Sequence, residues 1–411
     1  MKVVVFTLGC KVNSCESQAL LKGFADLGYE VSEELAFADV YVINTCAVTK
    51  EAEKKSRQAV SRVKKQNPNA KIIVTGCASE RAPQSFEDKE GVYLVTGTAC
   101  KEKILSLIDE GGTKIFEPET CYHELPMPKT TKARAYIKVQ DGCNNFCSYC
   151  IIPYLRGRSR SRNPQSVRSE IEALSPLEAV ITAINLSAYN FEGVDICGLI
   201  SALRGLNVRI RLGSLEENVI TEKFLLELSK LNDFAPHFHL SLQSGSDNTL
   251  KAMRRKYDTK SYLEGVELIR KYFNNAGITT DVIVGYPTET DEDFENSLEF
   301  IKRAKFSDVH VFTYSPREGT ASYKLKDLPP EIKKKRTERL FLLKEELKSK
   351  FINDNLNLLH QVIVEEFEDG YSVGYTANYI KVYISDKIKE GKYTVTLEKA
   401  FKDGALATIK E

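Results

Sequence analysis

Three cysteines stand close together in the middle of the chain, at the spacing CxxxCxxC. They are Cys143, Cys147 and Cys150. Three thiolates on one short loop can face a single point, and the thiolate is the form of cysteine that binds metals. A structural zinc site takes four protein ligands, and no fourth cysteine or histidine follows within the loop. A 4Fe–4S cluster also prefers four cysteines, so three predict a cluster with one open iron that can hold a small ligand. The alternative is three buried structural thiols.

A second set of three cysteines is spread over the first third of the chain. Cys10, Cys46 and Cys77 each follow a short apolar run typical of a buried strand, at residues 3–8, 40–44 and 71–75. Helical periodicity between these runs predicts a parallel sheet with helices on its faces. Because ligands collect beyond the carboxyl ends of parallel strands, we expect the three thiols to converge and hold a second cluster. The alternative is that small cysteines occupy strand ends by chance.

The elements that must position these cysteines divide the chain into an α/β part and a small β part. Residues 1–110 predict a parallel α/β domain, and residues 111–134, rich in Pro, Thr and Lys, predict a linker. Residues 135–352 repeat strand and helix patterns in the manner of a partial parallel (βα) barrel with a closing helix. Residues 353–411 contain about five short strands with Gly turns, which predict a small β-barrel.

Polar residues follow several of the predicted barrel strands. Chemistry in such barrels takes place at the carboxyl ends of the strands, so these residues are candidates for binding the small ligand. The alternative for each of them is a turn or a strand-end cap. The candidates are Asn185 and Ser187, Ser214 and Glu216, Gln243 and Ser244, and the stretch from Gly285 to Glu289.

A basic run follows the cysteine loop at period two. If the chain is extended there, its arginines point the same way and suit phosphate oxygens, because arginine forms bidentate, charge-assisted bonds. The alternatives are a solvated loop or internal salt bridges. The run is Arg156, Arg158, Arg160 and Arg162.

Composition limits the setting in which the protein works. The formal net charge of the 411 residues is +1, so any nucleic-acid surface must be a local patch. No apolar run is long enough to span a bilayer, and the start of the chain lacks the pattern of a signal peptide. We therefore expect a cytoplasmic protein with no membrane partner. Ten cysteines in that compartment indicate metal or redox use more than disulfides.

Several motifs together resemble the radical SAM methylthiotransferase family. They are Thr7-Leu-Gly-Cys10-Lys-Val-Asn13, Asn44-Thr-Cys46-Ala-Val-Thr49, Gly76-Cys77-Ala, the cysteine loop with Tyr149 before its third cysteine, Leu240-Ser-Leu-Gln243-Ser-Gly245 and Asp281-Val-Ile283-Val-Gly285. The resemblance covers nearly the whole chain, and the β module resembles the RNA-binding TRAM domain. The sequence departs from the family pattern at Cys15, Gly213 and Thr288.

The resemblance implies two 4Fe–4S clusters, one on each cysteine set, and S-adenosylmethionine at the open iron of the loop. The residues implied to contact S-adenosylmethionine are Tyr149, Asn185, Ser214, Gln243, Ile283 and Gly285. An electron from an external donor would cleave S-adenosylmethionine to a 5′-deoxyadenosyl radical, and the second cluster would carry sulfur to the substrate. We expect the enzyme to act as a monomer.

The motifs most resemble the subfamily that converts N6-threonylcarbamoyladenosine, beside the tRNA anticodon, to its 2-methylthio form. Three alternatives remain open at this point. The first is an enzyme that acts on isopentenyladenosine in tRNA, and the second modifies an aspartate of a ribosomal protein. The third is an iron–sulfur protein that binds RNA without catalysing a reaction.

Overall fold

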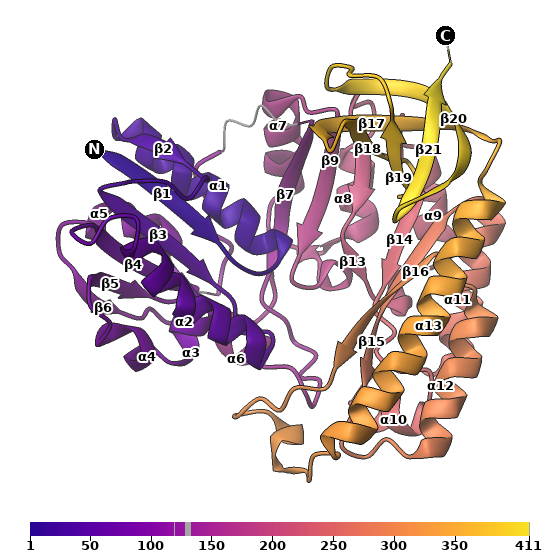
Figure 1. Ribbon diagram of the computed structural model, residues 1–411, viewed down its shortest axis with the longest axis horizontal. Helices are drawn as coiled ribbons and strands as arrows, with labels where there is room; N and C mark the ends of the chain where they lie inside the picture. The colour runs from indigo at the N-terminus through magenta and orange to yellow at the C-terminus, as the bar shows by residue number, and fades with distance from the viewer. Residues whose placement is uncertain (119, 128–132, 411) are drawn as a thin grey trace.

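The computed structural model describes residues 1–118, 120–127 and 133–410, so part of the predicted linker lies outside the described residues. A parallel sheet from the N-terminal part stands beside a larger barrel, and a small β-barrel caps one end of the latter (Figure 1). Within the described residues, no helix is both long and apolar enough to cross a membrane.

The N-terminal sheet has six parallel strands in the order β2-β1-β3-β4-β5-β6. Its strands are β1 (Lys2–Thr7), β2 (Glu30–Ser32), β3 (Val40–Thr45), β4 (Lys71–Gly76), β5 (Val92–Thr96) and β6 (Gly112–Lys114). The strand β6 lies within the predicted linker. Its sequence did not predict a strand, because three residues carry no pattern of their own and β6 forms by pairing with β5.

Helices cover both faces of this sheet, which is why its central strands are almost wholly apolar. Alternate residues of the strands pack against α1 (Lys11–Asp26) and α5 (Ile104–Leu107) on one face. The remaining alternate residues pack against α2 (Lys50–Lys64) on the other face. Because β3 pairs in parallel with both β1 and β4, the carboxyl ends of these three strands lie together at one edge of the sheet.

The second part is an incomplete parallel barrel. Its long strands are β7 (Arg134–Asp141), β9 (Glu178–Ala183), β12 (Arg209–Leu212), β14 (His237–Leu240), β15 (Gly277–Val284) and β16 (Asp308–Thr313). They form two four-stranded sheets, completed by the short β8 (Arg160–Ser161) and β13 (Ser214–Leu215). The outer helices are α7 (Pro164–Leu174), α8 (Ile196–Ala202), α9 (Glu222–Ser229), α10 (Asp247–Ala252), α11 (Thr259–Tyr272) and α12 (Asp291–Ala304).

The C-terminal strands close into a barrel in the order β17-β18-β19-β21-β20. They are β17 (Leu359–Glu368), β18 (Tyr371–Thr376), β19 (Lys381–Ile384), β20 (Gly391–Phe401) and β21 (Gly404–Ile409), and α13 (Pro330–Asp354) leads into them. This module covers the amino ends of the larger barrel, where the ring of Tyr379 stacks on His237 at 4.4 Å. The cysteine loop, which follows β7, lies at the opposite end (Figure 1). The predicted fold class, an α/β protein with a partial barrel and a small closed β-barrel, is confirmed.

Candidate functional site

Cys10, Cys46 and Cys77, which we call the strand-end triad, meet at the carboxyl edge of the N-terminal sheet. Cys10 is the N-cap of α1, Cys46 directly follows β3, and Cys77 begins the short helix α3 (Cys77–Arg81). Glycine is required beside Cys10, because a Cβ at Gly9 would lie 2.8 Å from the Cβ of Cys46 and φ there is +108°. The first and second cysteine loops therefore pack directly on one another.

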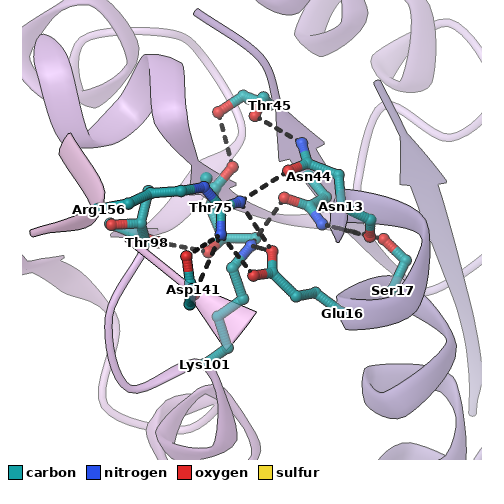
Figure 2. Close-up of polar contacts among 12 residues, drawn as sticks. Asn13, Glu16, Ser17, Asn44, Thr45, Thr75, Thr98, Lys101, Asp141 and Arg156 are labelled. Atoms are coloured by element: carbon teal, nitrogen blue, oxygen red, sulfur yellow. Dashed lines mark hydrogen bonds and ion pairs between the residues drawn. The ribbon is translucent and has the colours of Figure 1, made fainter. Parts of the chain in front are cut away.

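Hydrogen bonds fix the loops that carry the strand-end triad (Figure 2). The Asn13 side chain donates to the carbonyl oxygens of Leu8 at 2.7 Å and Thr45 at 3.0 Å. The Thr45 hydroxyl donates to the carbonyl oxygen of Thr75 at 2.7 Å. Asn13 and Thr45 thus tie the ends of all three strands together, which holds the cysteines in place before any ligand binds.

Without a metal, two thiols of the strand-end triad favour the protonated form. Burial, together with the neighbouring thiols of Cys77 and Cys10, raises the pKa of Cys46 to about 11. Burial also raises the pKa of Cys77. A bound cation reverses this preference, because metal coordination deprotonates thiols.

Cys143, Cys147 and Cys150, which we call the loop triad, lie on the turn between β7 and the helix α6 (Ile152–Arg156). The turn is held by the backbone, with the amide of Cys143 donating to the carbonyl oxygen of Gly157 at 3.1 Å. A side chain at Gly142 is excluded, because its Cβ would lie 2.0 Å from the carbonyl oxygen of Arg158. The Ser148 amide bonds the carbonyl oxygen of Met253 at 3.1 Å, which attaches the turn to the barrel.

Side chains from the barrel donate hydrogen bonds to the loop triad. Arg255 donates from Nη1 to Sγ of Cys147 at 3.2 Å, and Asn185 donates to Sγ of Cys143 at 3.8 Å. Glu216 orients both donors, because its carboxylate lies 2.8 Å from Arg255 Nη2 and 3.2 Å from Asn185 Nδ2. Donors of this kind stabilise thiolate sulfur and tune a metal that it binds.

Burial raises the pKa of the Cys143 thiol, and it raises that of Cys150 to about 12. The Cys147 thiol contributes to the raised pKa in both cases, and Cys143 contributes to that of Cys150. Cys46, Cys77, Cys143 and Cys150 therefore stay protonated until a cation replaces their protons. The chemistry of these donor sets fits iron–sulfur clusters.

A cavity of about 200 Å³ lies between the two parts of the molecule. Tyr149, Cys150, Gln243 and Ile283 line it from the barrel, so it collects three of the residues predicted to bind S-adenosylmethionine. Gln243 adopts a left-handed backbone conformation with φ +70°, a strained state of the kind that clusters at functional sites. Val48 and Thr49, which follow Cys46, line the cavity from the N-terminal part, and Arg317 lines it from the segment after β16.

Three predicted cofactor residues lie apart from this cavity lining. Asn185 instead contacts Cys143 of the loop triad, so its contact with S-adenosylmethionine stays a prediction. Ser214 is exposed on β13, and Gly285 follows β15. Gly285 has φ +74°, and a Cβ there would lie 2.4 Å from Cγ of Lys333 on α13. The structure thus gives Gly285 a packing reason for its lack of a side chain, and its contact with S-adenosylmethionine stays a prediction, as does that of Ser214.

The prediction of an extended comb of four arginines is wrong. Arg156 ends α6 and is 1% exposed, with its guanidinium bonded to Glu16 and Asp141. Arg162 is 7% exposed and pairs with Glu170 and Glu124. Arg160 is half-buried and lies 3.3 Å from the Asp141 carboxylate. Internal salt bridges, the alternative left open by the sequence, account for these three.

Arg158 differs from the other arginines of the run. Its side chain is exposed, and its guanidinium carbon lies 4.6 Å from the centre of the Phe146 ring. Arg158 remains a candidate for phosphate contact.

A buried ionic cluster, which sequence analysis did not predict, joins the N-terminal part to the barrel. Glu16 on α1 pairs with Lys101 at 2.9 Å, with Lys138 at 2.9 Å and with Arg156 at 2.8 Å (Figure 2). The carboxylate is 1% exposed. Although burial alone would raise its pKa, the three cations hold the pKa of Glu16 well below its usual range. Glu16 thus stays ionised as the hub between the two parts.

Polar residues continue from the cavity into the barrel. Asp281, which lines the cavity, has its carboxylate 3.2 Å from Nε2 of His239 and 3.3 Å from Nδ1 of His310. Deeper in the barrel, Arg211 donates two hydrogen bonds of 2.9 Å to Glu178. Burial lowers the pKa of the Lys11 ammonium, the charge of Arg211 lowers it as well, and the charge of Asp281 opposes this.

Two family models match this chain. The model of the Radical SAM superfamily matches residues 137–301, which include the loop triad. The model described as Uncharacterized protein family UPF0004 matches residues 2–97, which include the strand-end triad.

Curated relatives align with most of the chain. Threonylcarbamoyladenosine tRNA methylthiotransferase MtaB of Bacillus subtilis is 39% identical, over 93% of this chain and 90% of the relative. MtaB of Thermotoga maritima is 35% identical over 95% and 93%. The tRNA-2-methylthio-N(6)-dimethylallyladenosine synthase of Endomicrobium trichonymphae is 32% identical over 95% and 98%.

Among solved structures, the radical S-adenosylmethionine methyltransferase TsrM from Kitasatospora setae has a similar fold. Its structure, which contains cobalamin and a 4Fe–4S cluster, matches with a TM-score of 0.59 at 14% identity. The match covers 78% of this chain and 77% of that one, so the similarity of fold extends beyond the barrel.

Proposed function

This chain belongs to the radical SAM methylthiotransferases, and we propose that it converts N6-threonylcarbamoyladenosine in tRNA to the 2-methylthio derivative. In that reaction the hydrogen at C2 of the adenine is replaced by a methylthio group. The relatives named for threonylcarbamoyladenosine are 35–39% identical to this chain, and those named for dimethylallyladenosine are 32–33% identical. The difference supports the first substrate.

The polarity of the barrel interior also supports this substrate. The threonylcarbamoyl group carries a carboxylate and a hydroxyl, whereas the isopentenyl group is a hydrocarbon. Asp281 with its two histidines lines the cavity, and the Arg211–Glu178 pair and Lys11 lie near it in the barrel. An apolar group would remove water from these polar side chains without offering them hydrogen bonds, which costs free energy.

The two-cluster assignment is supported chiefly by the shared cavity. Its lining includes Cys150 of the loop triad and, from the N-terminal part, Val48 and Thr49, which follow Cys46 of the strand-end triad. When bound, the clusters would supply the electron that cleaves S-adenosylmethionine and the sulfur that enters the product. A common cavity lets both act on one substrate atom.

The protein's own residues bind, orient and exclude water. Tyr149, Gln243 and Ile283 would enclose S-adenosylmethionine, while Glu216 holds Arg255 and Asn185 against the thiolates of the loop triad. The small β-barrel and Arg158 would contact tRNA. A tRNA substrate implies that the enzyme works in the cytoplasm, and we propose that it acts as a monomer with an external electron donor.

Nucleoside analysis of tRNA from a deletion strain tests the substrate. We expect 2-methylthio-N6-threonylcarbamoyladenosine to disappear, its unmodified precursor to accumulate, and the wild-type gene to restore the product. Loss of the 2-methylthio form of isopentenyladenosine would identify the first alternative. Unchanged tRNA with an unmodified aspartate in a ribosomal protein would identify the second.

Release of 5′-deoxyadenosine by the reconstituted protein with dithionite separates an enzyme from an iron–sulfur protein that only binds RNA. The family predicts release. Its absence from a protein with fully loaded clusters would count against the proposed reaction.

A further inference from the structure

Two buried arginines from the barrel part flank the strand-end triad. Arg156 ends α6, and Arg317 follows β16. Their exposed fractions are 1% and 3%. The second part of the molecule thus supplies positive charge to cysteines that belong to the first.

Arg156 is held rigidly beside Cys77. Its Nη1 donates to Glu16 at 2.8 Å, and its Nη2 donates to the Asn13 side chain at 2.8 Å (Figure 2). Its Nε is buried and has no hydrogen-bond partner among the described residues. The helix α6, which Arg156 ends, packs against α3, which Cys77 begins. Arg156 thus brings a fixed positive charge to the strand-end triad.

Arg317 has the same arrangement beside Cys46. Its Nη2 donates at 2.7 Å to the carbonyl oxygen of Ala47, the residue after Cys46, and also pairs with Glu53 at 2.5 Å. Its Nε is likewise buried without a hydrogen-bond partner in the part of the chain that the structure describes.

A fixed positive charge and a free N–H group beside the cysteine ligands should raise the reduction potential of a bound cluster. One-electron reduction adds a negative charge, and the potential of an iron–sulfur cluster depends on local charge and on hydrogen bonds to its sulfur atoms. Both arginines are already oriented by other bonds, so they need little reorganisation when that charge arrives. An unpaired buried N–H is otherwise costly, which a sulfur acceptor would relieve.

We propose that Arg156 and Arg317 are positioning residues for an iron–sulfur centre on the strand-end triad, whose reduced state they stabilise through their charges and their free Nε–H groups. The electron comes from an external reductant, and no covalent bond changes in this step. This inference rests on the proposed function, because it requires a cluster on Cys10, Cys46 and Cys77.

The test isolates one centre in the full-length chain. A parent carrying Cys143→Ala, Cys147→Ala and Cys150→Ala is reconstituted anaerobically and should hold about four irons. Its reduction is followed by electron paramagnetic resonance during titration with dithionite. We expect Arg156→Gln and Arg317→Gln each to lower the equilibrium constant for reduction about tenfold, a shift of about 59 mV for one electron. Arg317→Lys keeps the charge without the planar donors and should shift the potential less.

Arg81→Gln is the matched control, because Arg81 shares Glu53 with Arg317, at 2.7 Å. Its potential should equal that of the parent, and a shift as large as that of Arg317→Gln would overturn the inference. Unchanged potentials in both glutamine variants, with iron retained, would also overturn it. If Arg156→Gln does not fold, Arg317→Gln decides alone. A parent that binds no iron would instead refute the second cluster, and with it the proposed function.

Discussion

The two cysteine triads provide the same ligands by different means. The loop triad comes from one short turn, and the hydrogen-bond donors to its sulfur atoms, Arg255 and Asn185, come from the same barrel. The strand-end triad comes from the ends of three separate strands. The two arginines beside it, Arg156 and Arg317, belong to the other part of the molecule.

The two triads therefore depend on different parts of the fold. The loop triad needs only its turn and the barrel mouth to be formed. The strand-end triad needs an intact sheet edge and also the correct docking of the N-terminal part on the barrel. Damage at the interface should therefore affect the second site and spare the first.

The largest expected effect follows from breaking the loop triad. Cys143→Ala removes one of the three cluster ligands, so release of 5′-deoxyadenosine should fall to background and iron should fall from about eight to about four per chain. Binding of tRNA should remain, because Cys143 lies in the barrel mouth and not on the β module. Deoxyadenosine assays and filter binding check this, and retained cleavage would overturn the assignment of the site.

Replacing Cys46 with alanine should separate the two halves of the reaction. Iron should again fall to about four per chain, yet deoxyadenosine release should continue while no methylthio product forms in tRNA. Iron analysis and nucleoside mass spectrometry provide the readouts. If the variant retains all its iron, the strand-end triad holds no cluster.

The two triads also differ in how far sequence could predict them. The loop triad could be predicted directly, because its three cysteines lie within eight residues of one another. The strand-end triad could be predicted only through the fold, because each of its cysteines follows one of the apolar runs that form β1, β3 and β4. Local signals likewise define α12 (Asp291–Ala304). Thr290 and Asp293 form a capping box at its start, and Lys305 adopts a left-handed conformation at its end.

The arginine run could not be predicted correctly, because its environment is set by distant residues. Period two predicts an extended comb, but α6 ends at Arg156, and the partner Glu16 lies 140 positions away in the sequence. The roles of Arg255 and Arg317 were missed for the same reason. A lone arginine carries no pattern until the fold places it beside a thiol.

Glu16→Gln should damage the strand-end triad selectively. It leaves Arg156, Lys101 and Lys138 buried without their shared carboxylate, and breaking a buried ion pair costs about 3–5 kcal/mol. We expect faster hydrogen exchange in α1 and loss of iron from the N-terminal site, with deoxyadenosine release retained. Glu34→Gln, at an exposed position, is the control. Equal loss of iron from both sites would contradict the separation of the triads.

In the metal-free protein, the rate of alkylation should differ among the cysteine thiols. At pH 8, a pKa of about 11 leaves roughly 0.1% of Cys46 as thiolate, and a pKa of about 12 leaves roughly 0.01% of Cys150. Cys10, which is exposed, should react first with iodoacetamide, then Cys46, then Cys150. Rates should rise with pH up to each pKa, as peptide mass spectrometry can show. Rapid labelling of Cys150 would mean that the loop is open without metal.

The smallest effect concerns Arg158, the exposed arginine beside the loop triad. If it contacts one phosphate, Arg158→Gln should weaken tRNA binding by roughly 1 kcal/mol and lower the slope of log affinity against log salt by about 1. Arg303→Gln is the control, because Arg303 lies at the end of the outer helix α12. Cluster content should not change in either variant. An unchanged salt dependence would remove Arg158 from the RNA surface, and none of the four arginines predicted there would remain.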